Sequence, residues 1–222
     1  MMMQALNYVY ITVILIAFIS SLIAFRLDLP FHLKLFSCLL GLTFIIECFV
    51  ALFERPIFHH RNNFWIYNSF GLVEFWLYGY FFYRIITVKA LRKVIFLFLL
   101  IFPIFWVITI FFLFGFNVWN SYVVIVGSFF SVIFAIMYYY QIITAKEIRS
   151  LRSMPEFWIA TGLLIFYLGE LPFFGVLNFL VSHDMLLTRS LLKVLKLLDT
   201  LMYGLFSYGF LCLIINTRKS SS

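Results

Sequence analysis

Long apolar runs separated by short polar or charged clusters form the main pattern along the chain. Seven such runs can be read, at Tyr8–Phe25, Leu33–Phe53, Phe64–Ile86, Val94–Phe114, Ser121–Ile143, Phe157–Asn178 and Leu191–Ile215. A helix needs about 20 apolar residues to cross a bilayer, whereas a barrel strand needs only about 10. The pattern therefore predicts an all-α, polytopic bundle of seven transmembrane helices, forming a single transmembrane domain over residues 1–222.

Two of these runs are weaker than the others. The second contains Glu47, and the first turns of the seventh contain Lys193 and Lys196. If either run fails to insert, the count becomes six. We find no internal repeat, so a transporter built from two matching halves is not favoured.

Composition agrees with a membrane protein and limits what else the chain can hold. Of its 222 residues, 65% are hydrophobic and 11% are charged, whereas soluble domains have about 45–50% and about 25%. The connections between the runs are too short for a folded kinase, nucleotidase or binding module. The first run has no basic residue before it, unlike a cleavable signal peptide, so we expect it to remain in the mature protein.

The basic residues are distributed unevenly between the two predicted sides of the membrane. One side holds eleven of them, namely Arg26, Lys34, Arg84, Lys89, Arg92, Lys93, Lys146, Arg149, Arg152, Arg218 and Lys219. The other side holds five, namely Arg55, Arg61, Arg189, Lys193 and Lys196. Positively charged loops favour the cytoplasm, so the predicted N-terminus is outside and the C-terminus inside.

Four acidic residues lie within the predicted helices: Glu47, Glu74, Glu170 and Asp199. Such groups cost at least about 2.5 kcal/mol at the centre of a helix, so they usually face a protein interior or a wet cavity. From the predicted orientation, all four lie in the outer half or the middle of the bilayer. We therefore expect one outward-opening polar cavity.

Neighbouring polar residues extend this interpretation. Tyr67, Glu74 and Tyr78 share one helical face with Asn68 beside it, while Lys196, Asp199 and Tyr203 share another. The candidate ligand-binding residues are Glu74, Asn68, Tyr67, Tyr78, Glu47, Glu170, Asp199, Lys196 and Tyr203.

Each acid also has a purely structural interpretation. Glu47 can extend towards the outer interface, and Asp199 can neutralise Lys196, which is one turn away. Glu74 has no basic residue within one turn and is the strongest functional candidate. Its alternative role is a hydrogen bond that joins two helices.

The sequence offers no metal site, cofactor site or recognised catalytic motif. His59, His60 and His183, with Asp184, fall in outer loops but match no metal-binding spacing, and we interpret them as solvated. Intramembrane zinc hydrolases of the alkaline ceramidase type need ligands that these runs lack. A retinal protein needs a lysine in the middle of the seventh helix, where this chain has MYGLFSYG.

The third run carries a family resemblance. The segment Arg61–Phe82 resembles a block of the form NNxWxYNxxxxxEFxxY found in a family of uncharacterised polytopic membrane proteins of Bacteroidota. The matching residues are Asn62, Asn63, Tyr67, Asn68, Glu74 and Tyr78, with Phe64 and Trp65 shifted by one position. The resemblance implies a Gram-negative inner membrane and a seven-span fold, and it implies no activity.

Three functions remain open at this point. The leading hypothesis is a sensor or receptor-like module that binds a small or lipidic ligand in the outward cavity and contacts a cytosolic or membrane partner. The basic residues expected to make that contact are Lys89, Arg92, Lys93, Lys146, Arg149 and Arg152. The alternatives are a transporter or proton-coupled carrier that uses the same acids, and an intramembrane lipid-modifying enzyme with Glu74 as general base. Nucleic acid is not an expected partner, because the charges lie at helix ends.

Overall fold

The structure is a computed structural model that describes residues 2–27, 29–53, 63–145, 151–183 and 185–220. Within these ranges the chain forms α-helices and no strand. The helices are α1 (Met2–Ala24), α2 (Phe31–Phe53), α3 (Phe64–Ile85), α4 (Lys89–Ile108), α5 (Ser121–Thr144), α6 (Pro155–His183) and α7 (Met185–Ser220). A π-helical turn, η1 (Thr109–Phe114), continues α4, and a short 3-10 turn, η2 (Leu151–Ser153), precedes α6.

Six of these helices are long and apolar enough to cross a membrane, and the chain is therefore a multi-pass helical membrane protein. The helix outside that set is α3, and not one of the two runs expected to be weak, since α2 and α7 both qualify. The reason lies in composition, because α3 carries Asn68, Glu74 and Arg84 among several Tyr and Trp residues. Asn68 is buried and Glu74 is half-buried, whereas Arg84 is exposed at the end of the helix.

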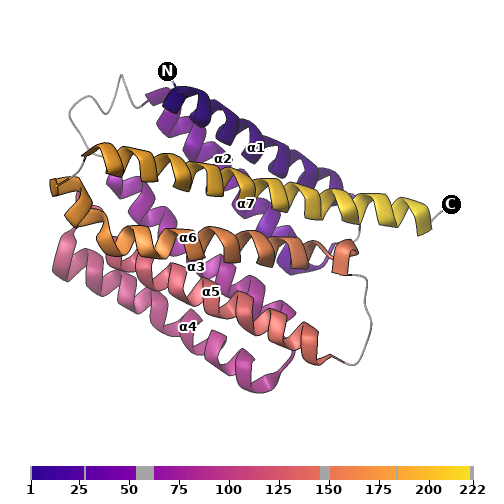
Figure 1. Cartoon of the computed structure of the whole chain (residues 1–222). Coiled ribbons are helices and arrows are strands. Elements are labelled where there is room, and N and C mark those ends of the chain that lie inside the picture. Colours follow the sequence, from indigo (N-terminus) through magenta and orange to yellow (C-terminus); the bar gives the residue numbers. More distant parts are fainter. Residues whose placement is uncertain (1, 28, 54–62, 146–150, 184, 221–222) are drawn as a thin grey trace.

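The helices form a ring (Figure 1). Following the contacts, α1 packs on α2, α2 on α3, α3 on α5, α5 on α6, α6 on α7, and α7 on α1 again. Helix α4 lies outside this ring against α3 and α5, at the edge opposite α1. Side chains on the inner faces of the ring helices therefore meet one another. This arrangement gives the four acids a shared protein interior to face.

The bundle has two ends, which we name by the chain termini that lie there (Figure 1). At the N-terminal end, α1, α3, α5 and α7 begin, and α2, α6 and α4 with its continuation η1 finish. At the C-terminal end, α1, α3, α5 and α7 finish and α2, α4 and α6 begin. Each helix therefore runs from one end of the bundle to the other. The position of a residue along its helix thus gives its distance from each end.

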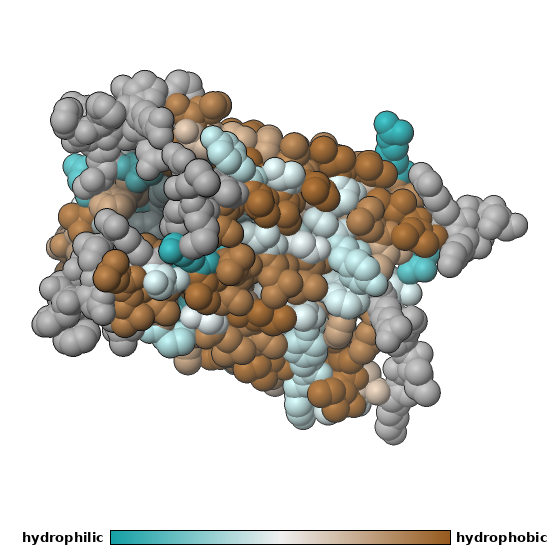
Figure 2. Space-filling model, turned by 45° about the horizontal axis from the view of Figure 1, so that its top comes forward, coloured by the Kyte–Doolittle hydropathy of each residue, from teal (hydrophilic) through white to brown (hydrophobic). Residues whose placement is uncertain are grey.

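The flank of the bundle is apolar (Figure 2). Hydrophobic side chains cover its middle, and hydrophilic ones gather towards the two ends. Large apolar side chains are strongly exposed, including Phe112 at 78% and Ile143 at 81%. A soluble monomer rarely exposes such continuous apolar surface, whereas lipid solvates it without cost.

Tightly packed aromatic side chains fill the middle of the ring. We call the group formed by Phe36, Tyr78, Phe81, Phe82 and Phe206 the aromatic layer, and all of its members are almost fully buried. The ring of Phe36 lies 5.1 Å from Phe206 and 5.4 Å from Phe81, centroid to centroid. Offset and edge-to-face pairs at such distances add about 0.5–1.5 kcal/mol each beyond burial. The layer separates the two ends of the bundle.

A glycine permits a close helix approach beside this core. A Cβ placed at Gly127 of α5 would overlap the ring of Phe75, which is buried against Phe102 and Tyr167. We expect Gly127→Ala to destabilise the fold by about 1–3 kcal/mol, the usual cost of overpacking a core. Thermal unfolding in detergent measures this effect. Gly204→Ala is the control, because a Cβ there meets no atom within 4 Å, and equal melting temperatures for both variants would contradict the packing.

Candidate functional site

A cavity of about 200 Å³ opens inside the ring at the N-terminal end. The four acids of the predicted transmembrane runs line it, with Glu47 on α2, Glu74 on α3, Glu170 on α6 and Asp199 on α7. Glu170 is buried, and the other three are partly exposed to the cavity. The sequence predicts that these residues lie at similar depth in the membrane. In the structure, the ring of helices brings their side chains around one cavity.

Two of the acids are held by hydroxyl groups. The Tyr78 hydroxyl donates a hydrogen bond to Oε1 of Glu74 at 3.0 Å, and Ser128 on α5 donates to Oε2 of Glu170 at 2.7 Å. Each bond uses one carboxyl oxygen and fixes the side chain. The second oxygen of each group remains available to a cavity occupant, since a carboxylate has room for several donors.

The other two acids, Glu47 and Asp199, lie near a lysine that is engaged elsewhere. The ammonium of Lys196 lies over the ring of Tyr10, 3.2 Å from its centroid. An ion pair between Lys196 and Asp199 was the structural alternative, but the described residues contain just one pair within 4.0 Å, between His32 and Glu156. The four acids of the cavity therefore have no cation in direct contact within the described part of the chain.

Aromatic side chains form much of the remaining wall. Nine aromatic residues line the cavity, namely Tyr10, Tyr67, Tyr167, Tyr203, Trp119, Phe70, Phe75, Phe166 and Phe174. The rings of Tyr10 and Tyr203 meet edge to face at 5.8 Å. Aromatic faces attract cations through their quadrupole. Carboxyl groups and aromatic faces together make a site suited to a positive group.

Two further hollows adjoin the cavity. One, of about 490 Å³, shares Tyr10, Glu47 and Tyr67 with it and has a mostly polar lining that includes Asn7 and Asn63. The other, of about 280 Å³, shares Glu170 and Asp199 with it and lies between α1, α6 and α7. Both include Lys196. The first provides a polar approach from the N-terminal end.

Asn68 was predicted to line the cavity as a ligand-binding residue, but it lies elsewhere. Its side chain is 5% exposed and does not line the cavity. Its amide nitrogen donates to the carbonyls of Phe116 and Val118, at 3.2 and 2.8 Å, and its oxygen accepts from the backbone N–H of Asn120 at 3.1 Å. Asn68 therefore fixes the loop between η1 and α5. That loop carries Trp119 into the cavity wall.

Comparison with known proteins adds no name to this site. No family model, curated protein or solved structure matches the chain. The described residues contain no group of three His, Cys, Asp or Glu side chains suited to hold a metal. His59, His60 and Asp184 lie outside the described residues, as does the side chain of His183.

The basic residues expected to contact a partner are only partly described. Lys89 and Lys93 are exposed at the start of α4, whereas the Arg92 guanidinium lies 4.2 Å from the ring centroid of Tyr83. Lys146 and Arg149 lie outside the described residues, and so does the side chain of Arg152. The two exposed lysines are compatible with anionic lipid as well as protein.

Sequence reasoning missed part of the cavity wall. Tyr10 sits in an uninterrupted apolar run, where a single tyrosine gives no signal. Trp119 lies between the fourth and fifth runs, where aromatic residues are common at the membrane interface, and in the structure it lines the cavity. Tyr78 is one layer below the cavity and reaches it through Glu74. The signal for Tyr167 was present, because it shares a helical face with Glu170.

Proposed function

We propose that the chain is a receptor-like membrane protein that binds a small organic ammonium cation in the acid cavity. The observation that carries the proposal is the meeting of four carboxyl groups from four helices without a cation in contact among the described residues. Buried acids are costly when unpaired. An ammonium group would supply the missing counter-charge, and the tyrosine faces would surround its apolar part.

The size of the cavity supports a small ligand over a lipidic one. Sites for drug-sized molecules occupy about 300–1,000 Å³, and this cavity holds about 200 Å³. An acyl chain or a retinal-sized polyene exceeds that space. A cation clearly smaller than a drug-sized molecule fits it.

The closed inner end of the cavity supports binding over passage. Below Glu74 the chain continues into the aromatic layer, whose members are almost fully buried. A ligand that enters from the N-terminal end would therefore meet a packed floor. In the predicted orientation that end faces outwards in an inner membrane, with the exposed Lys89 and Lys93 on the cytoplasmic side.

The matched pair tert-butylammonium and tert-butanol tests this proposal, because the two probes share a shape and differ in charge. We expect titration calorimetry on the protein in nanodiscs to give at least tenfold tighter binding for the ammonium. Equal binding of both probes would refute cation recognition. Counterflow of the ammonium into proteoliposomes would instead make the protein a carrier that uses the same acids.

Lys196 supplies a second expectation, since its ammonium already occupies the face of Tyr10. We expect Lys196→Gln to raise the affinity for tert-butylammonium about fivefold, because a competing cation is removed, and cation–π contacts are worth about 0.5–2 kcal/mol. Lys193→Gln is the matched control: Lys193 lies on the same helix and lines none of the described cavities. Unchanged or weaker binding in Lys196→Gln would show that Lys196 does not compete.

A further inference from the structure

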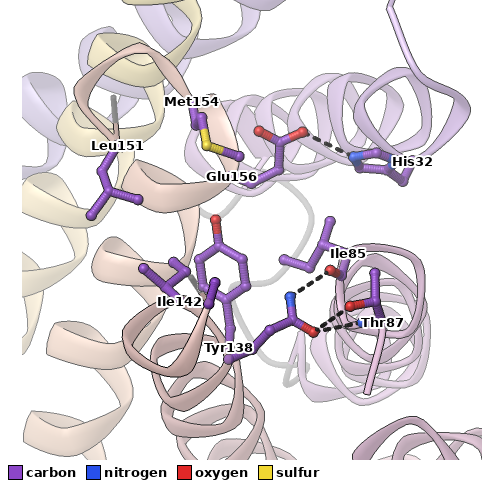
Figure 3. A pocket seen from close by; sticks show the side chains of 10 residues that line it. His32, Ile85, Thr87, Tyr138, Ile142, Leu151, Met154 and Glu156 are labelled. Carbon is purple, nitrogen blue, oxygen red and sulfur yellow. Dashed lines mark hydrogen bonds and ion pairs between the residues drawn. The ribbon is translucent and has the colours of Figure 1, made fainter. Parts of the chain in front are cut away.

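A second cavity, of about 520 Å³, lies at the C-terminal end of the bundle (Figure 3). Its wall combines His32 of α2, Tyr138 of α5 and Glu156 of α6 with residues of the α3–α4 turn. The aromatic layer separates it from the acid cavity. Thr87 and Ala145 line it and are exposed, so it reaches the surface at this end.

Tyr138 places an unused polar group in this cavity. Its side chain is 3% exposed, and its hydroxyl has no hydrogen-bond partner among the described residues. Figure 3 shows the hydroxyl directed towards the side on which Glu156 and Met154 lie. A buried hydroxyl without a partner costs about 1–3 kcal/mol. Such a group in a cavity wall points to a ligand that completes it.

Some of the other polar groups of the wall already make hydrogen bonds within the protein, and others remain available to a ligand. Gln141 is largely used, because its oxygen accepts from the backbone and hydroxyl of Thr87 and its nitrogen uses one of its two N–H groups to donate to the carbonyl of Ile85. His32 and Glu156 are paired, with Nε2 and Oε1 3.1 Å apart. The second carboxylate oxygen of Glu156 remains available as an acceptor.

Charge and polarity select the kind of ligand. The described lining contains no Lys or Arg, and its one carboxylate is paired with His32. A phosphate head group would find no Lys or Arg in the described lining, and His32 is already paired with Glu156. An isolated ammonium would compete with His32 for that carboxylate. Apolar side chains complete the wall, namely Ile85, Ile142, Leu151 and Met154. The site therefore combines a neutral hydrogen-bonding corner with an apolar surface.

We propose that this cavity binds the hydroxylated head group of a neutral monoglyceride. A glycerol hydroxyl can accept a hydrogen bond from Tyr138 and donate one to Glu156, which a carbonyl or an ether cannot do in both directions. The volume falls within the range for ligands of intermediate size. The acyl chain extends along the apolar wall towards the surrounding lipid. This inference does not depend on what the acid cavity binds.

Photocrosslinking tests the proposal on the full chain in nanodiscs, with a monoacylglycerol that carries a diazirine in its acyl chain. We expect labelled peptides from the end of α5 and the start of α6, and we expect 1-monooleoylglycerol to compete. Methyl oleate, which lacks hydroxyl groups, and free glycerol, which lacks the chain, should each compete at least fivefold less well. Equal competition by methyl oleate would show an unspecific lipid surface, and competition by glycerol alone would assign the site to a soluble polyol; either result overturns the proposal.

Tyr138→Phe removes the one hydroxyl and retains the ring, so the fold should persist. We expect it to reduce labelling at this site at least fivefold. Tyr140→Phe is the matched control on the same helix, because Tyr140 is 58% exposed and does not line the cavity. Equal labelling of Tyr138→Phe and the unsubstituted protein would exclude the hydroxyl as a ligand contact. The competition by methyl oleate uses no variant, and it tests the proposal even if Tyr138→Phe folds poorly.

Discussion

Glu74→Gln is expected to weaken the binding of tert-butylammonium at least tenfold, which corresponds to about 1.4 kcal/mol. The substitution keeps the size of the side chain and leaves an oxygen that can still accept the hydrogen bond from Tyr78. It removes the charge, and hydrogen bonds that involve a charged group are worth about 1.5–3 kcal/mol. Titration calorimetry in nanodiscs measures the change.

Two controls separate charge from shape in that experiment. Glu74→Asp keeps the carboxylate and should retain more affinity than Glu74→Gln. The neutral probe tert-butanol should bind both variants and the unsubstituted protein equally. Unchanged ammonium binding by Glu74→Gln would remove Glu74 from the site. A parallel loss for both probes would mean that the cavity had changed shape.

Asn68→Ala is expected to lower the stability of the fold by about 1–3 kcal/mol. The side chain makes three hydrogen bonds to the backbone of the loop between η1 and α5. Its removal leaves the N–H of the buried Asn120 without that partner, at a cost of about 1–3 kcal/mol, whereas water can reach the carbonyl of the exposed Val118. Thermal unfolding in detergent should show one of the largest decreases of any single substitution in α3.

The same loop offers the control for that prediction. Asn117→Ala changes an exposed asparagine next to Phe116, so its melting temperature should stay close to that of the unsubstituted protein. A small effect for Asn68→Ala, similar to that of Asn117→Ala, would contradict the anchoring role. In that case Asn68 would be free to serve the cavity, as its sequence position had suggested.

Hydrophobic runs predict the helices well because a bilayer demands about 20 apolar residues of each one. Charged residues within a run were a poor guide to which run is the least apolar: the second and seventh runs were expected to be the weakest, but the helix that falls outside the six candidate spans is α3. Polar residues count against insertion whether they face lipid or the protein interior, and α3 carries Glu74 into the cavity and buries Asn68 against the loop between η1 and α5. The order of helices around the ring cannot be read from apolar runs, since almost every face is apolar.

The candidate site was predictable to the extent that charge is costly in a membrane. That cost identified Glu47, Glu74, Glu170 and Asp199 together, and the ring gives them one cavity. Contacts between helices that are distant in the sequence could not be predicted from residue spacing. Lys196 is one turn from Asp199 but lies over Tyr10 of α1, and no spacing along α7 indicates that choice.

If the acid cavity holds an organic cation, an anomalous diffraction experiment locates that cation directly. Tetramethylarsonium is an inert quaternary cation whose arsenic gives an anomalous signal. In crystals soaked with it, we predict one arsenic peak in the cavity lined by Glu47, Glu74, Glu170 and Asp199. A cavity without arsenic, with the cation absent or bound only elsewhere on the molecule, would contradict the account.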